Sequence, residues 1–190
     1  MHSKAGARYN SLAFTSGGRP LIAYSDDANG DNQLDSVRLA EGVWNGTSYT
    51  WTIATLETGV QGYGVFANVG VDPAGNPVVS HQMRLLQRIG GAWFGELVDE
   101  GNGWVPCMTV DNAGNIHLAY DAGFLKVATR PADGSAPWSF SIADAQTYLW
   151  WPGSIRVGPD GLPAASYAGD DNESFNRVGL QFAKKNPAIP

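Results

Sequence analysis

The chain has 190 residues, which is enough for one well-buried domain or for two small ones. Its net charge is −6 and its basic residues are scattered, so we expect no nucleic-acid partner. No apolar stretch approaches the roughly 18–20 residues that span a bilayer, so we expect no membrane insertion either. The 24 glycines and 11 prolines, with few charged residues, favour strands and tight turns over helices.

The composition also bears on the compartment. A chain rich in glycine and asparagine and poor in lysine suits a secreted or periplasmic protein, and this is the localisation we expect. Cys107 is the single cysteine, which excludes an intrachain disulfide and a cysteine-based metal cluster. Because it lies in an apolar stretch, we expect a buried, inert thiol.

Four segments of the chain align with one another without gaps. Each reads as an alternating strand, a tight turn that contains glycine, and a second alternating strand. The segments are Ser11–Tyr24, Asn68–His81, Cys107–Tyr120 and Ser154–Tyr167. Their turn glycines, Gly18, Gly75, Gly114 and Gly161, are 57, 39 and 47 residues apart. Self-similarity at about 40–50 residues is typical of propeller blades.

Further strands follow each repeated segment. A third strand is expected at Val37–Ala40, Leu85–Ile89, Leu125–Thr129 and Val178–Ala183. A fourth strand, opened by a tryptophan, is expected at Trp51–Leu56, Trp93–Val98 and Trp138–Ala143. The pattern predicts an all-β fold, a single β-propeller domain over residues 1–190 with blades at 7–58, 59–100, 101–146 and 147–190. The last blade lacks its outer strand, and the ring closes alone or as half of a larger ring.

The repeat resembles the sialidase-like (BNR-type) propeller repeats of bacterial extracellular proteins. The residues that carry the resemblance are Val71–Pro77, Val110–Asp121 and the three tryptophans that open the fourth strands. The resemblance implies a propeller fold and no particular activity. An active sialidase is not expected, because that family's enzymes need about twice this length and a cluster of three arginines.

The loops at one face of a propeller usually hold its ligand. The residues expected to bind a ligand on that face are Arg8, Tyr9, Tyr63, His81, Arg84, Trp104, Asp121, Trp150, Trp151 and Asp170. Aromatic rings beside carboxylates and an arginine suit a neutral sugar, a small apolar molecule or a peptide loop. Core packing of the same aromatics, or an oligomer interface, is the alternative.

One loop has the oxygen donors that a calcium ion needs. Asp27, Asn29, Asp31 and Asp35 stand at the first, third, fifth and ninth positions of this loop. The sixth position is Asn32 instead of glycine, and an Asn-Gly-Asp turn forms without metal. Calcium is therefore one hypothesis for this loop, and a plain hairpin is the other.

The sequence favours a non-catalytic module that recognises carbohydrate or a similar small ligand. A second hypothesis is a structural unit that forms a homo-oligomer and completes a larger ring. A third is a glycoside hydrolase or lyase whose acid and base come from the loops of Asp26, Asp121 and Asp170, since paired carboxylates do acid–base chemistry.

Overall fold

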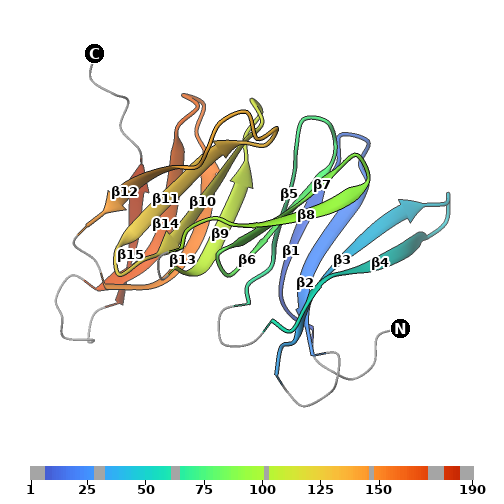
Figure 1. The fold of residues 1–190 in the computed structure, drawn as a ribbon, viewed down its shortest axis with the longest axis horizontal. Coiled ribbons are helices and arrows are strands. Elements are labelled where there is room, and N and C mark those ends of the chain that lie inside the picture. The colour runs from blue at the N-terminus through green and yellow to red at the C-terminus, as the bar shows by residue number, and fades with distance from the viewer. Residues whose placement is uncertain are drawn as a thin grey trace. The chain divides into compact units, whose positions relative to one another are not determined.

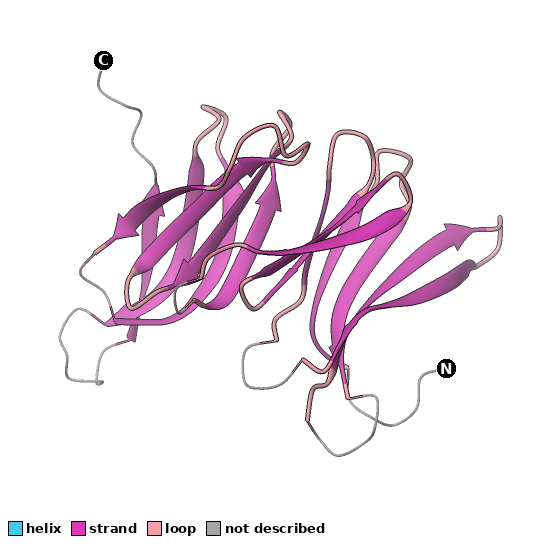
Figure 2. Ribbon diagram, viewed as in Figure 1, coloured by secondary structure: helices cyan, strands magenta, loops and turns pink. Residues whose placement is uncertain are grey.

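The computed structural model describes residues 7–27, 33–60, 65–100, 103–145, 148–170 and 178–184. These residues form strands, turns and loops, without a helix (Figure 2). The chain divides into two compact units, residues 1–97 and 98–190. Figure 1 labels the strands of both units, and each unit is described by itself.

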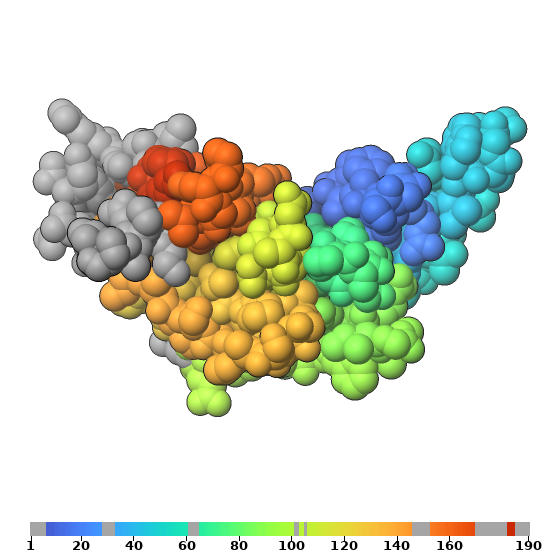
Figure 3. Space-filling view, turned by 90° about the horizontal axis from the view of Figure 1, so that it is seen from above, coloured from blue at the N-terminus to red at the C-terminus, as the bar shows by residue number. Residues whose placement is uncertain are grey.

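The first unit contains two four-stranded antiparallel sheets. The first sheet has the order β1-β2-β3-β4, with β1 Arg8–Phe14, β2 Pro20–Asp26, β3 Ser36–Trp44 and β4 Tyr49–Thr58. The second sheet has the order β5-β6-β7-β8, with β5 Asn68–Val71, β6 Pro77–His81, β7 Arg84–Ile89 and β8 Ala92–Leu97. In Figure 3 these sheets, blue to cyan and green, lie against each other.

The second unit contains the third and fourth sheets. The third sheet has the order β9-β10-β11-β12, with β9 Trp104–Val110, β10 Asn115–Asp121, β11 Leu125–Pro131 and β12 Ser139–Asp144. The fourth sheet has the order β13-β14-β15, with β13 Tyr148–Val157, β14 Pro163–Asp170 and β15 Val178–Lys184. Within the described residues this last sheet has three strands, as the sequence predicted.

The turns between first and second strands follow from local side-chain chemistry. Asp72 holds its turn by accepting a hydrogen bond from the backbone N–H of Asn76 onto Oδ1 at 2.7 Å. Asp111 accepts the same bond from Asn115, also at 2.7 Å. Each turn ends on a glycine with a φ of 85°, Gly75 or Gly114, a conformation that side chains with a Cβ rarely adopt.

Apolar side chains fill the space between the two sheets of each unit. In the first unit the buried core includes Leu21, Leu39 and Val79. In the second unit Cys107, Ile155 and Tyr167 form part of the core. Cys107 is buried as expected, and burial raises the pKa of its thiol to about 12.

Four antiparallel sheets in up-and-down order are the blades of a β-propeller. The fold is therefore all-β and a four-bladed propeller, which confirms the predicted fold class. No helix that could span a membrane occurs in the part of the chain that the structure describes.

Candidate functional site

The second unit brings two aspartates to corresponding strand ends. Asp121 is the last residue of β10, and Asp170 is the last residue of β14. These are the second strands of the third and fourth sheets, which share one core, so both residues belong to the same end of that unit. The repeat explains the placement, because equivalent strands end at equivalent places.

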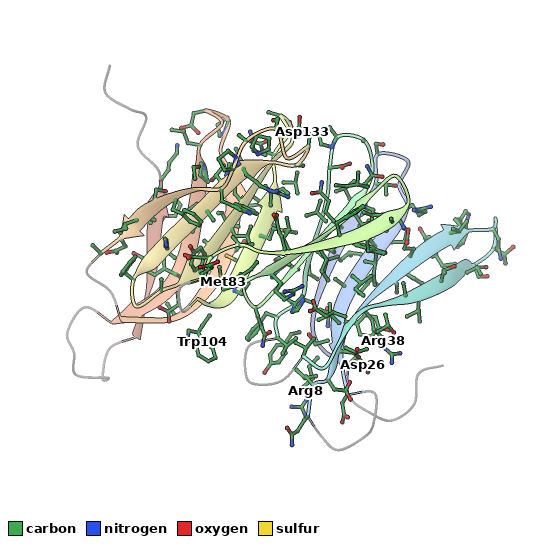
Figure 4. All side chains as sticks on the ribbon, in the orientation of Figure 1. Arg8, Asp26, Arg38, Met83, Trp104 and Asp133 are labelled. Carbon is green, nitrogen blue, oxygen red and sulfur yellow. The ribbon has the colours of Figure 1, made fainter. Side chains whose placement is uncertain are left out.

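An aromatic residue stands directly opposite Asp121. Trp104, the first residue of β9, is its cross-strand partner, and a bulge shifts the register just before this pair. Trp104 is exposed, and Figure 4 shows its side chain at the end of the unit opposite Asp133. An exposed indole beside a carboxyl group is an arrangement that binds the C–H face of a sugar ring.

Asp121 has the electrostatics of a group that can hold a proton. Burial raises the pKa of its carboxyl above the ordinary value, and the one opposing effect is a hydrogen bond from the backbone N–H of Gly123. That bond joins the N–H to Oδ1 at 2.7 Å. A carboxyl group with a raised pKa can donate a proton in acid–base catalysis.

Four of the predicted ligand residues fall where less is described. Trp150 and Trp151 lie within β13, and β13 pairs with β14 through Tyr148 and Asp170. For Trp150, Trp151 and Asp170 the strand position is described and the side chain is not. Tyr63 lies outside the described residues.

In the first unit, Arg8 and Tyr9 open β1 at the strand end where Asp26 closes β2 (Figure 4). The ring of Tyr9 packs on Phe66 with centroids 4.0 Å apart. Nε of Arg38 lies 3.1 Å from Oδ2 of the buried Asp26. Arg38, in the neighbouring strand β3, thus balances the charge of Asp26.

His81 and Arg84 contact a carboxylate of the first sheet. Nε2 of His81 lies 2.9 Å from Oε2 of Glu57, and Nε of Arg84 donates to the same oxygen at 3.0 Å. His81 is fully buried, and its burial lowers the pKa of the imidazole. His81 therefore joins the second sheet to the first through Glu57.

The same kind of contact recurs in the second unit. Tyr120, which corresponds to His81, donates its hydroxyl to Oδ2 of Asp99 at 2.6 Å, and Nζ of Lys126 lies at the same distance from that oxygen. Tyr167 donates to Oδ2 of Asp144. We call these three groups, centred on Glu57, Asp99 and Asp144, the carboxylate clamps.

Sequence reasoning missed the three clamp carboxylates, although a signal was present. Each stands six residues after a repeat tryptophan, namely Trp51, Trp93 or Trp138. The aromatic or imidazole partner was visible in the repeat. Its acidic partner lies elsewhere in the chain, so only the equal spacing could have linked the two residues.

The proposed calcium loop falls mostly outside the described residues. Asn29 and Asp31 lie there, while Asp27 is buried and the backbone N–H of Asp35 donates to the carbonyl of Asp26 at 3.1 Å. Among the residues that the structure describes, no three His, Cys, Asp or Glu side chains gather as a metal site. Calcium binding here stays a prediction.

A cavity of about 180 Å³ lies between the third and fourth sheets. Val127, Ile142, Pro163 and Lys184 are among its lining residues. Pro163 begins β14, so the cavity is at the opposite end of that strand from Asp170. It is separate from the candidate site.

No family model matches this sequence, and no curated protein matches it. Several solved structures share its fold. A protein of unknown function from Bacteroides caccae is 13% identical with a TM-score of 0.62, and the alignment covers 97% of this chain and 65% of that protein. The chain therefore spans less than two thirds of that protein's length.

Two similar structures are of carbohydrate-acting enzymes. An α-L-arabinanase from Penicillium chrysogenum, in complex with arabinobiose, is 13% identical with a TM-score of 0.59, over 97% of this chain and 63% of the enzyme. The α-L-arabinofuranosidase of Fusarium graminearum, with an iminosugar inhibitor, is also 13% identical with a TM-score of 0.56. The alignment covers 94% of this chain and 62% of the enzyme.

These comparisons correct one sequence-based preference. The favoured hypothesis was a non-catalytic binding module, and it is contradicted because similar structures of known activity are glycoside hydrolases. The alternative of an enzyme is the better supported of the two. The propeller fold implied by the sialidase-like resemblance is confirmed, and the finer assignment to that repeat family stays a hypothesis.

Proposed function

We propose that this protein is a glycoside hydrolase whose acid–base pair is Asp121 and Asp170 in the second unit. The observation that carries the proposal is Asp121 itself: a carboxyl group with a pKa raised by burial, placed opposite an exposed tryptophan. Glycoside hydrolysis needs one carboxyl group that is protonated and a second that is ionised.

The roles follow from this requirement. Asp121 donates its proton to the glycosidic oxygen as the bond from that oxygen to the anomeric carbon breaks. Asp170 acts as the ionised partner, which activates water or attacks the anomeric carbon. Trp104 stacks on the sugar ring and so fixes its position beside Asp121.

The proposed substrate is an oligosaccharide of arabinose. This class is supported by the arabinan-acting enzymes that share the fold, one of which holds arabinobiose. A neutral furanose also suits a site whose described residues are an aromatic ring and a carboxyl group, without a clustered positive charge.

The test is turnover of linear arabino-oligosaccharides by the wild type and by D121N and D170N. Each variant should lose at least about 100-fold in kcat, the lower end of what acid–base groups contribute. Asp133 provides the matched control, since its fully exposed carboxyl lies at the other end of the same unit (Figure 4). D133N should keep wild-type turnover. Full activity in D121N would remove Asp121 from the mechanism.

A further inference from the structure

The cavity of about 180 Å³ in the second unit lies at a place that the first unit fills with side chains. Both sheets that form it, the third and the fourth, belong to this one unit. Its apolar lining includes Val127, Ala143, Ile155, Pro163, Ala165 and Ala183. Because the two units repeat the same pair of sheets, each lining position can be compared with its counterpart in the first unit.

Two alanines of the fourth sheet replace larger side chains of the second sheet. Ala165 in β14 corresponds to Val79 in β6 in the aligned segments. The cross-strand partner of Ala165 is Ala183, and the partner of Val79 is Leu86. Val79 and Leu86 are buried in the core of the first unit. The fourth sheet therefore presents less side-chain volume to its neighbour than the second sheet does.

The third sheet is also smaller at this place than the first. Ala143 stands five residues after Trp138, as Leu56 stands five residues after Trp51. Leu56 packs against the core of the first unit, and Ala143 packs against the core of the second. A leucine is thus replaced by an alanine on this side of the cavity too.

The largest difference is a tryptophan. Trp93 in β8 packs against the core of the first unit. Gly95, two residues further along β8, pairs with Leu86, so the alternation of the strand puts Trp93 on the same face as Leu86. Within the described residues the fourth sheet ends at β15 and has no strand that corresponds to β8. The cavity therefore lies where the first unit places an indole ring and longer aliphatic side chains.

The lining favours an apolar ligand over water. Its polar side chains are Ser141 and Lys184, and Nζ of Lys184 lies 2.5 Å from Oδ2 of Asp160, which balances its charge. A buried water needs about two to four polar partners, whereas an apolar protein cavity of about 150 Å³ stays dry and binds benzene. A cavity of about 180 Å³ therefore has room for a small aromatic ring system.

We propose that this cavity is a binding site for a small, neutral aromatic molecule of the size of indole. The ring would take the place that Trp93 takes in the first unit, and the hydroxyl of Ser141 provides an uncharged hydrogen-bonding group beside it. The site is at the opposite end of β14 from Asp170. The proposal therefore does not rest on the proposed hydrolase activity.

The test is titration of the protein with indole, followed by calorimetry. The wild type should bind one indole per chain in a saturable manner. A183L introduces the residue that the first unit has at this position, Leu86, and should abolish the binding. It should also raise the melting temperature, because it fills a cavity. A136L is the matched control, since Ala136 is exposed in the same unit. It should keep both the binding and the melting temperature of the wild type.

Two further variants locate the bound indole. A143L fills the cavity from the third sheet and should also abolish binding, which keeps the test decisive if circular dichroism shows that A183L is unfolded. W104A should bind indole as the wild type does, because Trp104 does not line the cavity. A wild type that does not bind indole would overturn the proposal. Undiminished binding in folded A183L or A143L, or binding that is lost in W104A, would overturn it as well.

Discussion

His81 joins the second sheet to the first through Glu57, with Nε2 of the imidazole 2.9 Å from Oε2 of the carboxylate. Its counterparts in the third and fourth sheets, Tyr120 and Tyr167, bind carboxylates in the same way with a hydroxyl group. A clamp can therefore be built with either a histidine or a tyrosine. The two differ because an imidazole can take up a proton near neutral pH, whereas a tyrosine hydroxyl cannot.

This difference predicts a dependence of stability on pH. Burial lowers the pKa of His81 in the folded protein below the value of about 6.5 of an exposed histidine. As the pH falls through about 6.5, the unfolded chain therefore binds the proton first. The contribution of a neutral His81 to the free energy of unfolding is therefore retained above that pH and lost below it. In H81Y the slope of melting temperature against pH should be smaller between pH 7 and 5. An unchanged slope would show that His81 is not responsible.

A second prediction concerns the clamp at Asp99. Removing the hydroxyl of Tyr120 takes away its hydrogen bond to the charged carboxylate of Asp99. Y120F should lower the free energy of unfolding by about 1.5–3 kcal/mol, measured with urea. Tyr49 is the control, because it is an exposed tyrosine on the outer hairpin of the first sheet. Equal losses of unfolding free energy in Y120F and Y49F would show that the clamp has no special role in stability.

A third prediction concerns the close packing of the first sheet. A Cβ added at Gly42 would lie 2.8 Å from Cγ of Pro20 and 3.0 Å from the ring of Trp51. G42A should therefore destabilise the protein by about 1–3 kcal/mol, as overpacking does. In G17A the nearest atom is 3.9 Å away, and the melting temperature should stay close to that of the wild type. A neutral G42A would mean that Trp51 moves away freely.

A fourth prediction separates binding from chemistry at the proposed site. If Trp104 holds the sugar ring, W104A should raise KM for arabino-oligosaccharides several-fold and change kcat less. Asp121 acts as the acid, so kcat/KM of the wild type should fall as the pH rises through its raised pKa. D121E should move that descending limb of the pH profile. A limb that stays in place would assign the acid to another group.

The repeat could be predicted from the sequence because its signals are local. The turns at Asp72 and Asp111 depend on an aspartate and a glycine three residues apart, and the structure forms them with the expected hydrogen bonds. The positions of Asp121 and Trp104 at corresponding strand ends follow from the same alignment. Contacts between sheets were harder to foresee, because the partner lies in another strand.

His81 shows where the sequence stopped being sufficient. Its place in the repeat was clear, but its burial and its bond to Glu57 depend on how two sheets pack.

The most direct test of the proposed function is product release from linear arabino-oligosaccharides, followed by chromatography. The wild type should release shorter sugars at a rate well above that of the enzyme-free solution. The double variant D121N/D170N, folded by circular dichroism, should release none above that background. Absence of product with the wild type, or equal product with the double variant, would contradict the assignment of a glycoside hydrolase with these two carboxylates.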